Sequence, residues 1–327
     1  MTIALLGLPF PNYEISPAWL LILFLLIGFA ALNFGGDYLT DGAVTIATNL
    51  NISKAVVGLT IVSMATSMPE MITSLLAAKT SPGLALGNIL GSNIANIGLI
   101  LGITALIIPL TVQQRLIRRE VPLMIGVTLL FTLFAIGGFE RWEGFVMLAI
   151  LPVYLYFVIR WAKRDPEEAQ ETSEETEACS TKKGLGFVVA GSALLAIGAD
   201  VLVGTSVELA GRLGVSDVLI GLTIVAIGTS LPELAASVSA ARSGHGDICV
   251  GNVIGSNLFN ILLIGGAVAS LIPIPVDPIL FRMEFPALLF ITLLFLVLYK
   301  NGRRVTAKEG LFLLFSYFSI IALSSIF

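Results

Sequence analysis

The stretch GLTIVSMATSMPE at residues 58–70 occurs a second time, as GLTIVAIGTSLPE at residues 221–233. Each copy is followed by another shared phrase, LGNILGSNIANIG at 86–98 and VGNVIGSNLFNIL at 250–262. Both copies lie within long apolar stretches, which is typical of a membrane protein built from two related halves.

Each copy of the first phrase ends in a carboxylate, Glu70 in one half and Glu233 in the other. An ionisable residue at membrane depth is costly and marks a functional site by default. Two of them at equivalent positions, surrounded by Thr, Ser, Asn and Gly, indicate a cation pathway between the two repeats.

The composition supports a membrane protein. Hydrophobic residues make up 56% of the chain and charged residues only 12%, against about 25% charged in soluble domains. No basic region with a cleavage site precedes the first apolar stretch, so we expect that stretch to span the membrane. Two cysteines and one histidine argue against a disulfide framework or a multi-histidine metal site. No basic cluster interleaved with aromatics is present, so we expect no nucleic-acid partner.

Apolar stretches of roughly 20 residues predict ten transmembrane helices. They lie near residues 17–39, 54–78, 83–109, 120–138, 142–162, 185–208, 217–241, 247–272, 281–299 and 308–326.

The distribution of Lys and Arg predicts the orientation of these spans. If the N-terminus lies outside, every Lys and Arg falls on the inner side except Lys79, Arg141, Arg212 and Arg282. The chain is therefore predicted to be a multi-pass protein of the plasma membrane with both termini outside the cell.

The repeat predicts an inverted architecture, because five spans in each half place the second half in the membrane upside down. We expect an all-α membrane protein whose first repeat covers residues 1–163, with its signature at 58–98. Residues 164–184 form an acidic cytoplasmic linker, and residues 185–327 form the second repeat, with its signature at 221–262.

Proline occurs in both first phrases, as Pro69 and Pro232. Because proline has no backbone N–H, it frees a carbonyl about one turn upstream, near residues 63–65 and 226–228. Free carbonyls at membrane depth need another helix, water or an ion to satisfy them.

Oxygen-bearing side chains gather around the prolines and in the second phrases. In a single helix, such Asn and Ser residues would be typical of interhelical hydrogen bonds, whereas their repetition in both halves favours a site. The first phrases contribute Thr66, Ser67, Glu70, Thr229, Ser230 and Glu233. The second phrases contribute a stripe at intervals of four residues, formed by Asn88, Ser92 and Asn96 and again by Asn252, Ser256 and Asn260.

Electrostatics favours a bound cation between the glutamates. Two ionised carboxylates about 5 Å apart repel by roughly 3 kcal/mol at an effective dielectric constant of 20. A divalent ion, several monovalent ions or protons would relieve this repulsion. Oxygen ligands without thiolate or imidazole suit Ca²⁺ better than Mg²⁺, and they also suit Na⁺.

At these residues the chain resembles the sodium/calcium exchanger family of the cation/calcium antiporter superfamily, especially its prokaryotic members. The paired phrases TSMPE with GNILGSNIANI, and TSLPE with GNVIGSNLFNI, are similar to that family's two signature repeats. The resemblance covers nearly the whole chain. It implies a ten-helix fold in which helices 2, 3, 7 and 8 surround the ions, while helices 1 and 6 slide to alternate access.

The resemblance also implies a Ca²⁺ site, formed by Glu70 and Glu233 together with backbone carbonyls of Thr66 and Thr229. Sodium sites are implied on either side of it. One is formed by Ser67, Glu70, Ser256 and the carbonyl of Ser63, and the other by Ser230, Glu233, Ser92 and the carbonyl of Ala226.

Asn96 and Asn260 are implied to line the middle of the site. Some potassium-dependent relatives carry Asp at the position of Asn260, so the neutral residue here argues against potassium coupling. We therefore expect antiport of Na⁺ against Ca²⁺ by a monomer, with no cofactor beyond the transported ions.

Three alternatives remain open at this point. Ca²⁺/H⁺ exchange would use protons on Glu70 and Glu233 in place of sodium. A cation channel would conduct without countertransport. An intramembrane enzyme is disfavoured, because the chain has neither an HExxH nor a GxSxG motif.

Overall fold

The computed structural model describes residues 13–162, 180–215, 226–300 and 304–324. Within these ranges the regular elements are helices, apart from the two-residue strands β1 (Leu110–Thr111) and β2 (Arg304–Val305), which pair antiparallel. Eight of the described helices are long and apolar enough to cross a membrane. The predicted all-helical membrane fold is confirmed.

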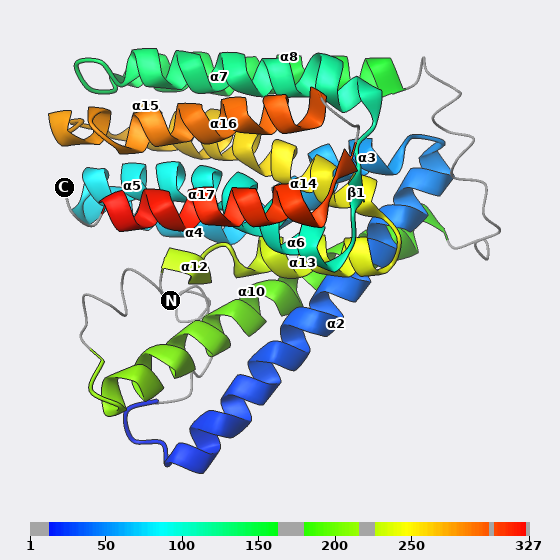
Figure 1. Ribbon diagram of the computed structural model, residues 1–327, viewed down its shortest axis with the longest axis vertical. Coiled ribbons are helices and arrows are strands. Elements are labelled where there is room, and N and C mark those ends of the chain that lie inside the picture. The colour runs from blue at the N-terminus through cyan, green and yellow to red at the C-terminus, as the bar shows by residue number, and fades with distance from the viewer. Residues whose placement is uncertain (1–12, 163–179, 216–225, 301–303, 325–327) are drawn as a thin grey trace.

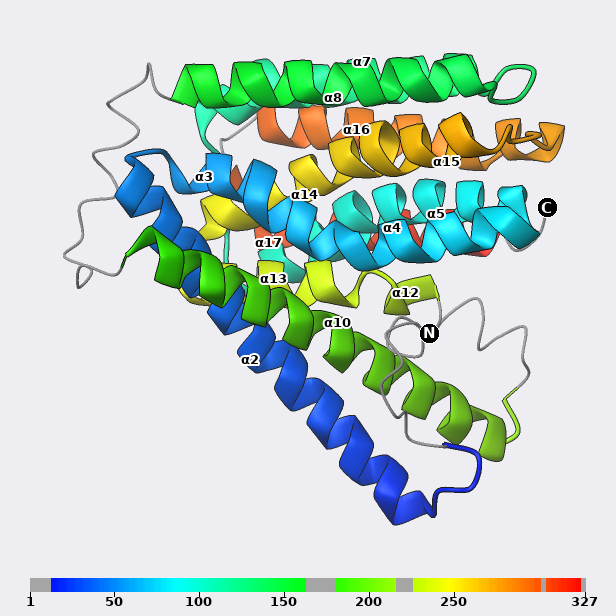
Figure 2. The same cartoon turned by 180° about the vertical axis from the view of Figure 1, so that it is seen from behind.

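Two long helices, α2 (Ala18–Leu50) and α10 (Thr181–Arg212), lie side by side and cross the remaining helices obliquely (Figures 1 and 2). Their backbones approach closely because glycine recurs at every seventh position of each contact face. A Cβ on Gly35 would lie 3.0 Å from the carbonyl oxygen of Gly191. The glycines of this antiparallel contact are Gly28, Gly35 and Gly42 of α2 with Gly198, Gly191 and Gly184 of α10.

The repeated phrases form the centre of the molecule. In the first repeat they build α3 (Lys54–Val57), the π-helical segment η1 (Gly58–Val62), α4 (Ser63–Thr80), α5 (Pro82–Ala95), the π-helical segment η2 (Asn96–Ile100) and α6 (Leu101–Ile107). In the second repeat they build α12 (Ala226–Gly228), α13 (Leu231–Arg242), α14 (Gly246–Phe259), the π-helical segment η6 (Asn260–Gly265) and α15 (Gly266–Leu271).

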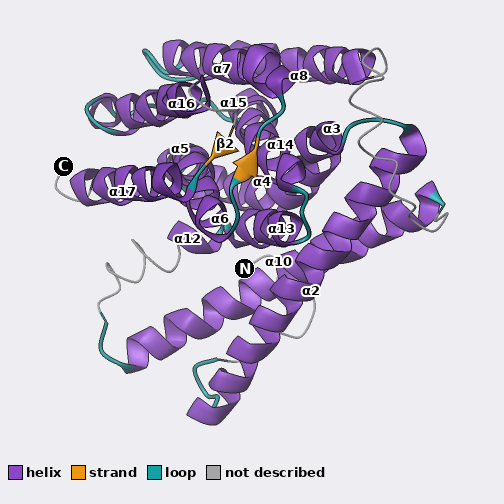
Figure 3. Ribbon diagram, turned by 45° about the vertical axis from the view of Figure 1, so that its right-hand side comes forward, coloured by secondary structure: helices purple, strands orange, loops and turns teal. Residues whose placement is uncertain are grey.

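The remaining helices pack around this centre, as the turned view in Figure 3 shows. They are the π-helical segment η3 (Leu116–Glu120), α7 (Val121–Phe134) and α8 (Arg141–Ala162) in the first repeat, and the 3₁₀ turn η7 (Pro278–Phe281), α16 (Glu284–Lys300) and α17 (Ala307–Ser324) in the second.

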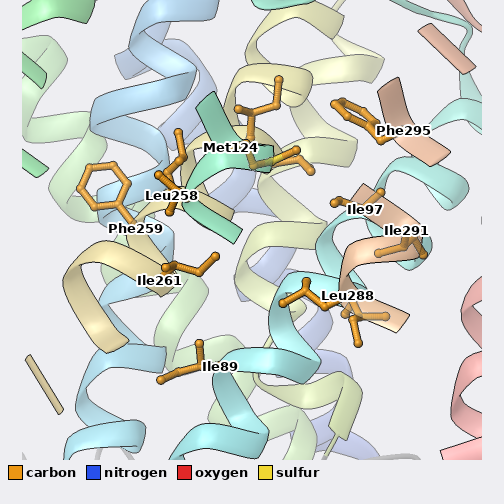
Figure 4. Close-up of a cluster of buried hydrophobic side chains, with 14 of the residues drawn as sticks. Ile89, Ile97, Met124, Leu258, Phe259, Ile261, Leu288, Ile291 and Phe295 are labelled. Atoms are coloured by element: carbon orange, nitrogen blue, oxygen red, sulfur yellow. The ribbon is translucent and has the colours of Figure 1, made fainter. Parts of the chain in front are cut away.

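Burial identifies the two most central spans. In the most apolar window of each helix, 94% of the residues of Gly246–Leu271 and 83% of those of Pro82–Ile107 are buried, against 22% in α2. The buried apolar side chains of this region include Ile97, Met124, Leu258 and Phe259 (Figure 4). The polar stripes of the sequence therefore lie on the two most buried spans of the described chain.

Two of the ten predicted spans are absent from the eight candidates. The span near 120–138 corresponds to η3 and α7, which ends at Phe134 and is too short to qualify alone. The span near 217–241 corresponds to α12 and α13, preceded by residues 216–225, which lie outside the described part of the chain. Most of the predicted linker, residues 164–179, also lies outside it.

Candidate cation site

The two glutamates are carried by helices that differ in regularity. Glu70 lies in α4, which runs from Ser63 to Thr80 without interruption at Pro69. Glu233 lies in the first turn of α13, and a turn at Thr229 and Ser230 separates this helix from α12. The sequence predicted a disturbance near both prolines, and only the second repeat has a break there.

Both carboxylates are buried at the contact between the repeats, with 1% of Glu70 and none of Glu233 exposed. They lie close enough to interact with each other. Ser67 of α4 donates a hydrogen bond to Oε1 of Glu233 at 3.4 Å. In the amide orientation that satisfies its neighbours, the nitrogen of Asn260 in η6 donates to Oε2 of Glu70 at 3.1 Å and to the carbonyl of Ser256 at 3.3 Å. Each carboxylate is thus bound by a residue of the other repeat.

Several buried oxygens of this region accept no hydrogen bond from the described residues. Ser92 and Ser230 are both neighbours of the Glu70 carboxylate, yet neither hydroxyl reaches hydrogen-bonding geometry. A buried polar atom without a partner costs about 1–3 kcal/mol, so such a cluster calls for an additional ligand. The atoms are Oε1 of Glu70, Oγ of Ser92, Oδ1 of Asn96, Oγ of Ser230 and Oε2 of Glu233.

The hydroxyl of Thr66 has partners within the protein. It donates to the carbonyl of Val62 at 3.1 Å and contacts Oδ1 of Asn252 at 3.3 Å. Ser256 lies near the same Oδ1 atom, at 3.5 Å. Asn252 therefore joins the signature helices of the two repeats.

Ser63 makes a structural contact. Its hydroxyl donates to the carbonyl of Gly58 at 2.6 Å and to that of Asn252 at 3.0 Å, so it links η1 to α14. The sequence assigned only the carbonyl of Ser63 to the site, and this hydroxyl bond is compatible with that assignment. In the second repeat, Ala226 begins α12 and Thr229 lies half-buried in the turn that follows.

A π-helical segment begins at each of the middle asparagines, η2 at Asn96 and η6 at Asn260. Such segments are rare in proteins and occur frequently at functional sites. The sequence does not predict them, because the residues that follow both asparagines are almost all apolar or glycine and show no change of period.

Two further asparagines hold the polar groups in place. Asn257 accepts a hydrogen bond from Asn96 at 3.0 Å, and Asn252 contacts Thr66. Asn252 belongs to the predicted stripe but was not among the candidate ligands, and Asn257 was missed. It follows Ser256 directly in the chain and so lies off the stripe. Its presence in the repeated phrase GSN was the available signal.

The donor set determines which ligand fits. Among the described residues, no group of three or more His, Cys, Asp or Glu could hold a metal. Two carboxylates accompanied by hydroxyl and amide oxygens suit Ca²⁺ or Na⁺, which accept flexible oxygen coordination. The site can therefore take hard cations between the two repeats.

Comparison with known proteins identifies relatives over most of the chain. The family model described as "Sodium/calcium exchanger protein" matches residues 20–160 and again residues 183–326. Putative antiporter CaxA of Alkalimonas amylolytica is 40% identical over 90% of this chain and 95% of its own length. Sodium/calcium exchanger MaX1 of Methanosarcina acetivorans is 32% identical over 91% and 97%.

The fold also matches a solved structure. The sodium-calcium exchanger NCX_Mj, soaked with Na⁺ and Ca²⁺, superposes with a TM-score of 0.80 at 30% identity, over 93% of this chain and 98% of that one. The similarity thus extends over both repeats and the helices around them.

Proposed function

Because this chain belongs to the sodium/calcium exchanger family, a family of transporters and not of enzymes, we propose that it exchanges Na⁺ for Ca²⁺ across the membrane. The observation that carries the proposal is the cluster of buried, unpartnered oxygens around Glu70 and Glu233. Both repeats contribute to it.

The charge of the site explains how the two ions compete. Two ionised glutamates neutralise one Ca²⁺, and they are also available to Na⁺ once Ca²⁺ leaves. Because each cation needs the same carboxylates, the site favours occupation by one species at a time. Sliding of α2 and α10, the first helix of each repeat, across the other helices then exposes the loaded site to either side.

The stoichiometry decides whether transport senses voltage. If three Na⁺ replace one Ca²⁺, the loaded site gains one positive charge. Each exchange cycle then moves net charge, which is worth about 2.3 kcal/mol per 100 mV. We therefore expect exchange at that ratio to be electrogenic.

The assignment of individual ligands follows the repeat. Ca²⁺ lies between Glu70 and Glu233 with the carbonyls of Thr66 and Thr229. Sodium occupies one site at Ser67, Glu70, Ser256 and the carbonyl of Ser63, and a second at Ser230, Glu233, Ser92 and the carbonyl of Ala226. Support comes from the unpartnered, buried hydroxyls of Ser92 and Ser230.

The names of the relatives support the choice of ions. NCX_Mj is called a sodium-calcium exchanger and was soaked with both ions, and MaX1 is called a sodium/calcium exchanger. Both matches extend over more than nine-tenths of this chain.

The test is Ca²⁺ uptake into proteoliposomes that contain the purified protein. Vesicles loaded with Na⁺ and diluted into Na⁺-free buffer should accumulate radiolabelled Ca²⁺, whereas vesicles loaded with choline should not. Equal uptake with and without the Na⁺ gradient would show that sodium is not the coupling ion.

Ca²⁺/H⁺ exchange is the second candidate, favoured by a pair of buried carboxylates that protons could also neutralise. A pH gradient that drives Ca²⁺ uptake in Na⁺-free buffer would select it. Steady conductance without countertransport would instead indicate a channel.

The membrane location is supported by a relative whose name gives it. Inner membrane protein YrbG of Escherichia coli is 34% identical over 84% of this chain. We infer residence of a monomer in the plasma membrane, with both termini outside and the acidic linker inside. Labelling of cysteines introduced singly into the loops would test this orientation.

A further inference from the structure

Asn257 is a buried side chain that the transport model does not use. It lies in α14, is 1% exposed, and directly follows Ser256 of the polar stripe. Its amide oxygen accepts a hydrogen bond from Nδ2 of Asn96 at 3.0 Å. Asn96 belongs to the other repeat, so this bond joins the two halves close to the cation site.

The backbone carbonyl of Asn93 fixes the orientation of the Asn257 and Asn96 amides, because it can only accept a hydrogen bond. The nitrogen of Asn257 lies 3.3 Å from the backbone carbonyl of Asn93, and a carbonyl cannot donate. Asn257 must therefore direct its nitrogen to that carbonyl and its oxygen to Asn96. Asn96 must in turn present its nitrogen to Asn257, which leaves its own oxygen on the opposite side of the amide.

The free oxygen of Asn96 is available to a cation. It is buried and accepts no hydrogen bond from the described residues. Asn96 lies one helical turn beyond Ser92, on the helix face that carries the neighbour of the Glu70 carboxylate. An amide oxygen held there is a neutral ligand. It already has the orientation needed for binding before the ion arrives.

The equivalent asparagine of the second repeat is arranged differently. The neighbours of the Asn260 amide assign its nitrogen to two acceptors, Oε2 of Glu70 at 3.1 Å and the carbonyl of Ser256 at 3.3 Å, so this amide donates to a carboxylate. Asn93, which corresponds to Asn257, bonds the carbonyl of Ile89 in its own helix at 2.7 Å. The hydrogen bond from Asn96 to Asn257 thus has no equivalent between Asn260 and Asn93.

We propose that Asn257 is a positioning residue that aims the carbonyl oxygen of Asn96 at the transported cation, so that the two middle asparagines serve unlike roles. Asn96 supplies an oxygen to the ion, and Asn260 supplies an N–H to Glu70. The proposal rests on the proposed function, because it concerns the same ions.

The experiment measures equilibrium binding of radiolabelled Ca²⁺ to purified protein, with Na⁺ as competitor, and the melting temperature of each variant. Asn257→Leu removes the acceptor for Asn96 and should weaken Ca²⁺ binding about tenfold, the effect of losing one well-placed ligand. Asn93→Leu, the matched change in the other repeat, should leave binding within about twofold.

A double-mutant cycle separates positioning from packing. In an Asn96→Asp background both terminal atoms are oxygens, so the orientation of the group no longer matters and Asn257→Leu should cause no further loss of Ca²⁺ binding. A loss of the same size in both backgrounds would overturn the proposal, as would equal effects of Asn257→Leu and Asn93→Leu. If Asn257→Leu does not fold, Asn257→Ala removes the same acceptor with less added bulk.

The outcomes also distinguish this proposal from the function on which it rests. If the wild-type protein binds Ca²⁺ in competition with Na⁺ and Asn257→Leu binds it unchanged, only the positioning role is wrong. If the wild-type protein binds neither ion, the proposed function fails and the positioning role fails with it.

Discussion

The segment Ser63–Glu70 of the first repeat and the segment Ala226–Glu233 of the second share the motif TSxPE but differ in structure. The first continues through Pro69 as one helix, preceded by a π-helical segment. The second consists of a short helix, a turn and a new helix that begins beside Pro232. Proline therefore permits a break in this motif without enforcing one.

The difference extends to the residues around the segments. Ser63 bonds the carbonyl of Asn252 across the repeats, whereas its equivalent is Ala226, which has no hydroxyl. Asn96 is held by Asn257, whereas Asn260 is turned to Glu70. A duplicated sequence thus forms one asymmetric site, as expected of a transporter that is closed toward one side while it opens toward the other.

The largest expected effect comes from replacing either glutamate, the position at which the two repeats remain equivalent. Glu70→Gln and Glu233→Gln should each abolish Na⁺-dependent Ca²⁺ uptake, by about 100-fold or more, because each removes half of the formal negative charge at the site. Flux into proteoliposomes measures this effect. Full exchange in both variants would remove the central assignment.

The second prediction concerns packing of the equivalent glycines Gly255 and Gly91. A Cβ on Gly255 would lie 2.5 Å from the carbonyl oxygen of Leu59, while a Cβ on Gly91 meets no described atom within 4 Å. Gly255→Ala should lower stability by about 1–3 kcal/mol through overpacking. Gly91→Ala is the matched control, and thermal unfolding in detergent compares them. Equal melting temperatures would show that the asymmetry is not maintained in solution.

The third prediction distinguishes the two middle asparagines. An aspartate at position 260 can replace the N–H donated to Glu70 only while it is protonated. Asn260→Asp should therefore keep Ca²⁺ transport, with half-saturation changed by less than about tenfold, but make its ion dependence sensitive to pH. The variant should resemble the wild type most at low pH, and uptake measured across a pH series tests this. A pH profile identical to that of the wild type would contradict it.

The smallest expected effect concerns Ser63. Ser63→Ala removes the hydrogen bond to Asn252 and makes the first repeat match the natural Ala226 of the second. It should cost about 1 kcal/mol of stability and leave transport intact, because the hydroxyl is not proposed as a ligand. Melting temperature and Ca²⁺ flux of the same preparation check both parts. Loss of flux at unchanged stability would place the hydroxyl in the transport pathway.

The sequence by itself determined the class of fold and the chemistry at its centre. Apolar stretches of spanning length can only be helices in a bilayer, where every backbone group must be bonded internally. A repeated glutamate with hydroxyl and amide neighbours is too costly at that depth to be incidental. The buried Glu70, Glu233, Ser92 and Ser230 follow from these two constraints.

Only the tertiary structure decided how the two halves differ. The hydrogen bond between Asn96 and Asn257 joins residues far apart in the chain. The helix break before Glu233 likewise depends on the contacts of the folded protein. The motif TSxPE is identical in the two repeats, so this motif alone cannot distinguish them. Their different environments do, because each amide and hydroxyl takes the partner that the opposite repeat leaves within reach.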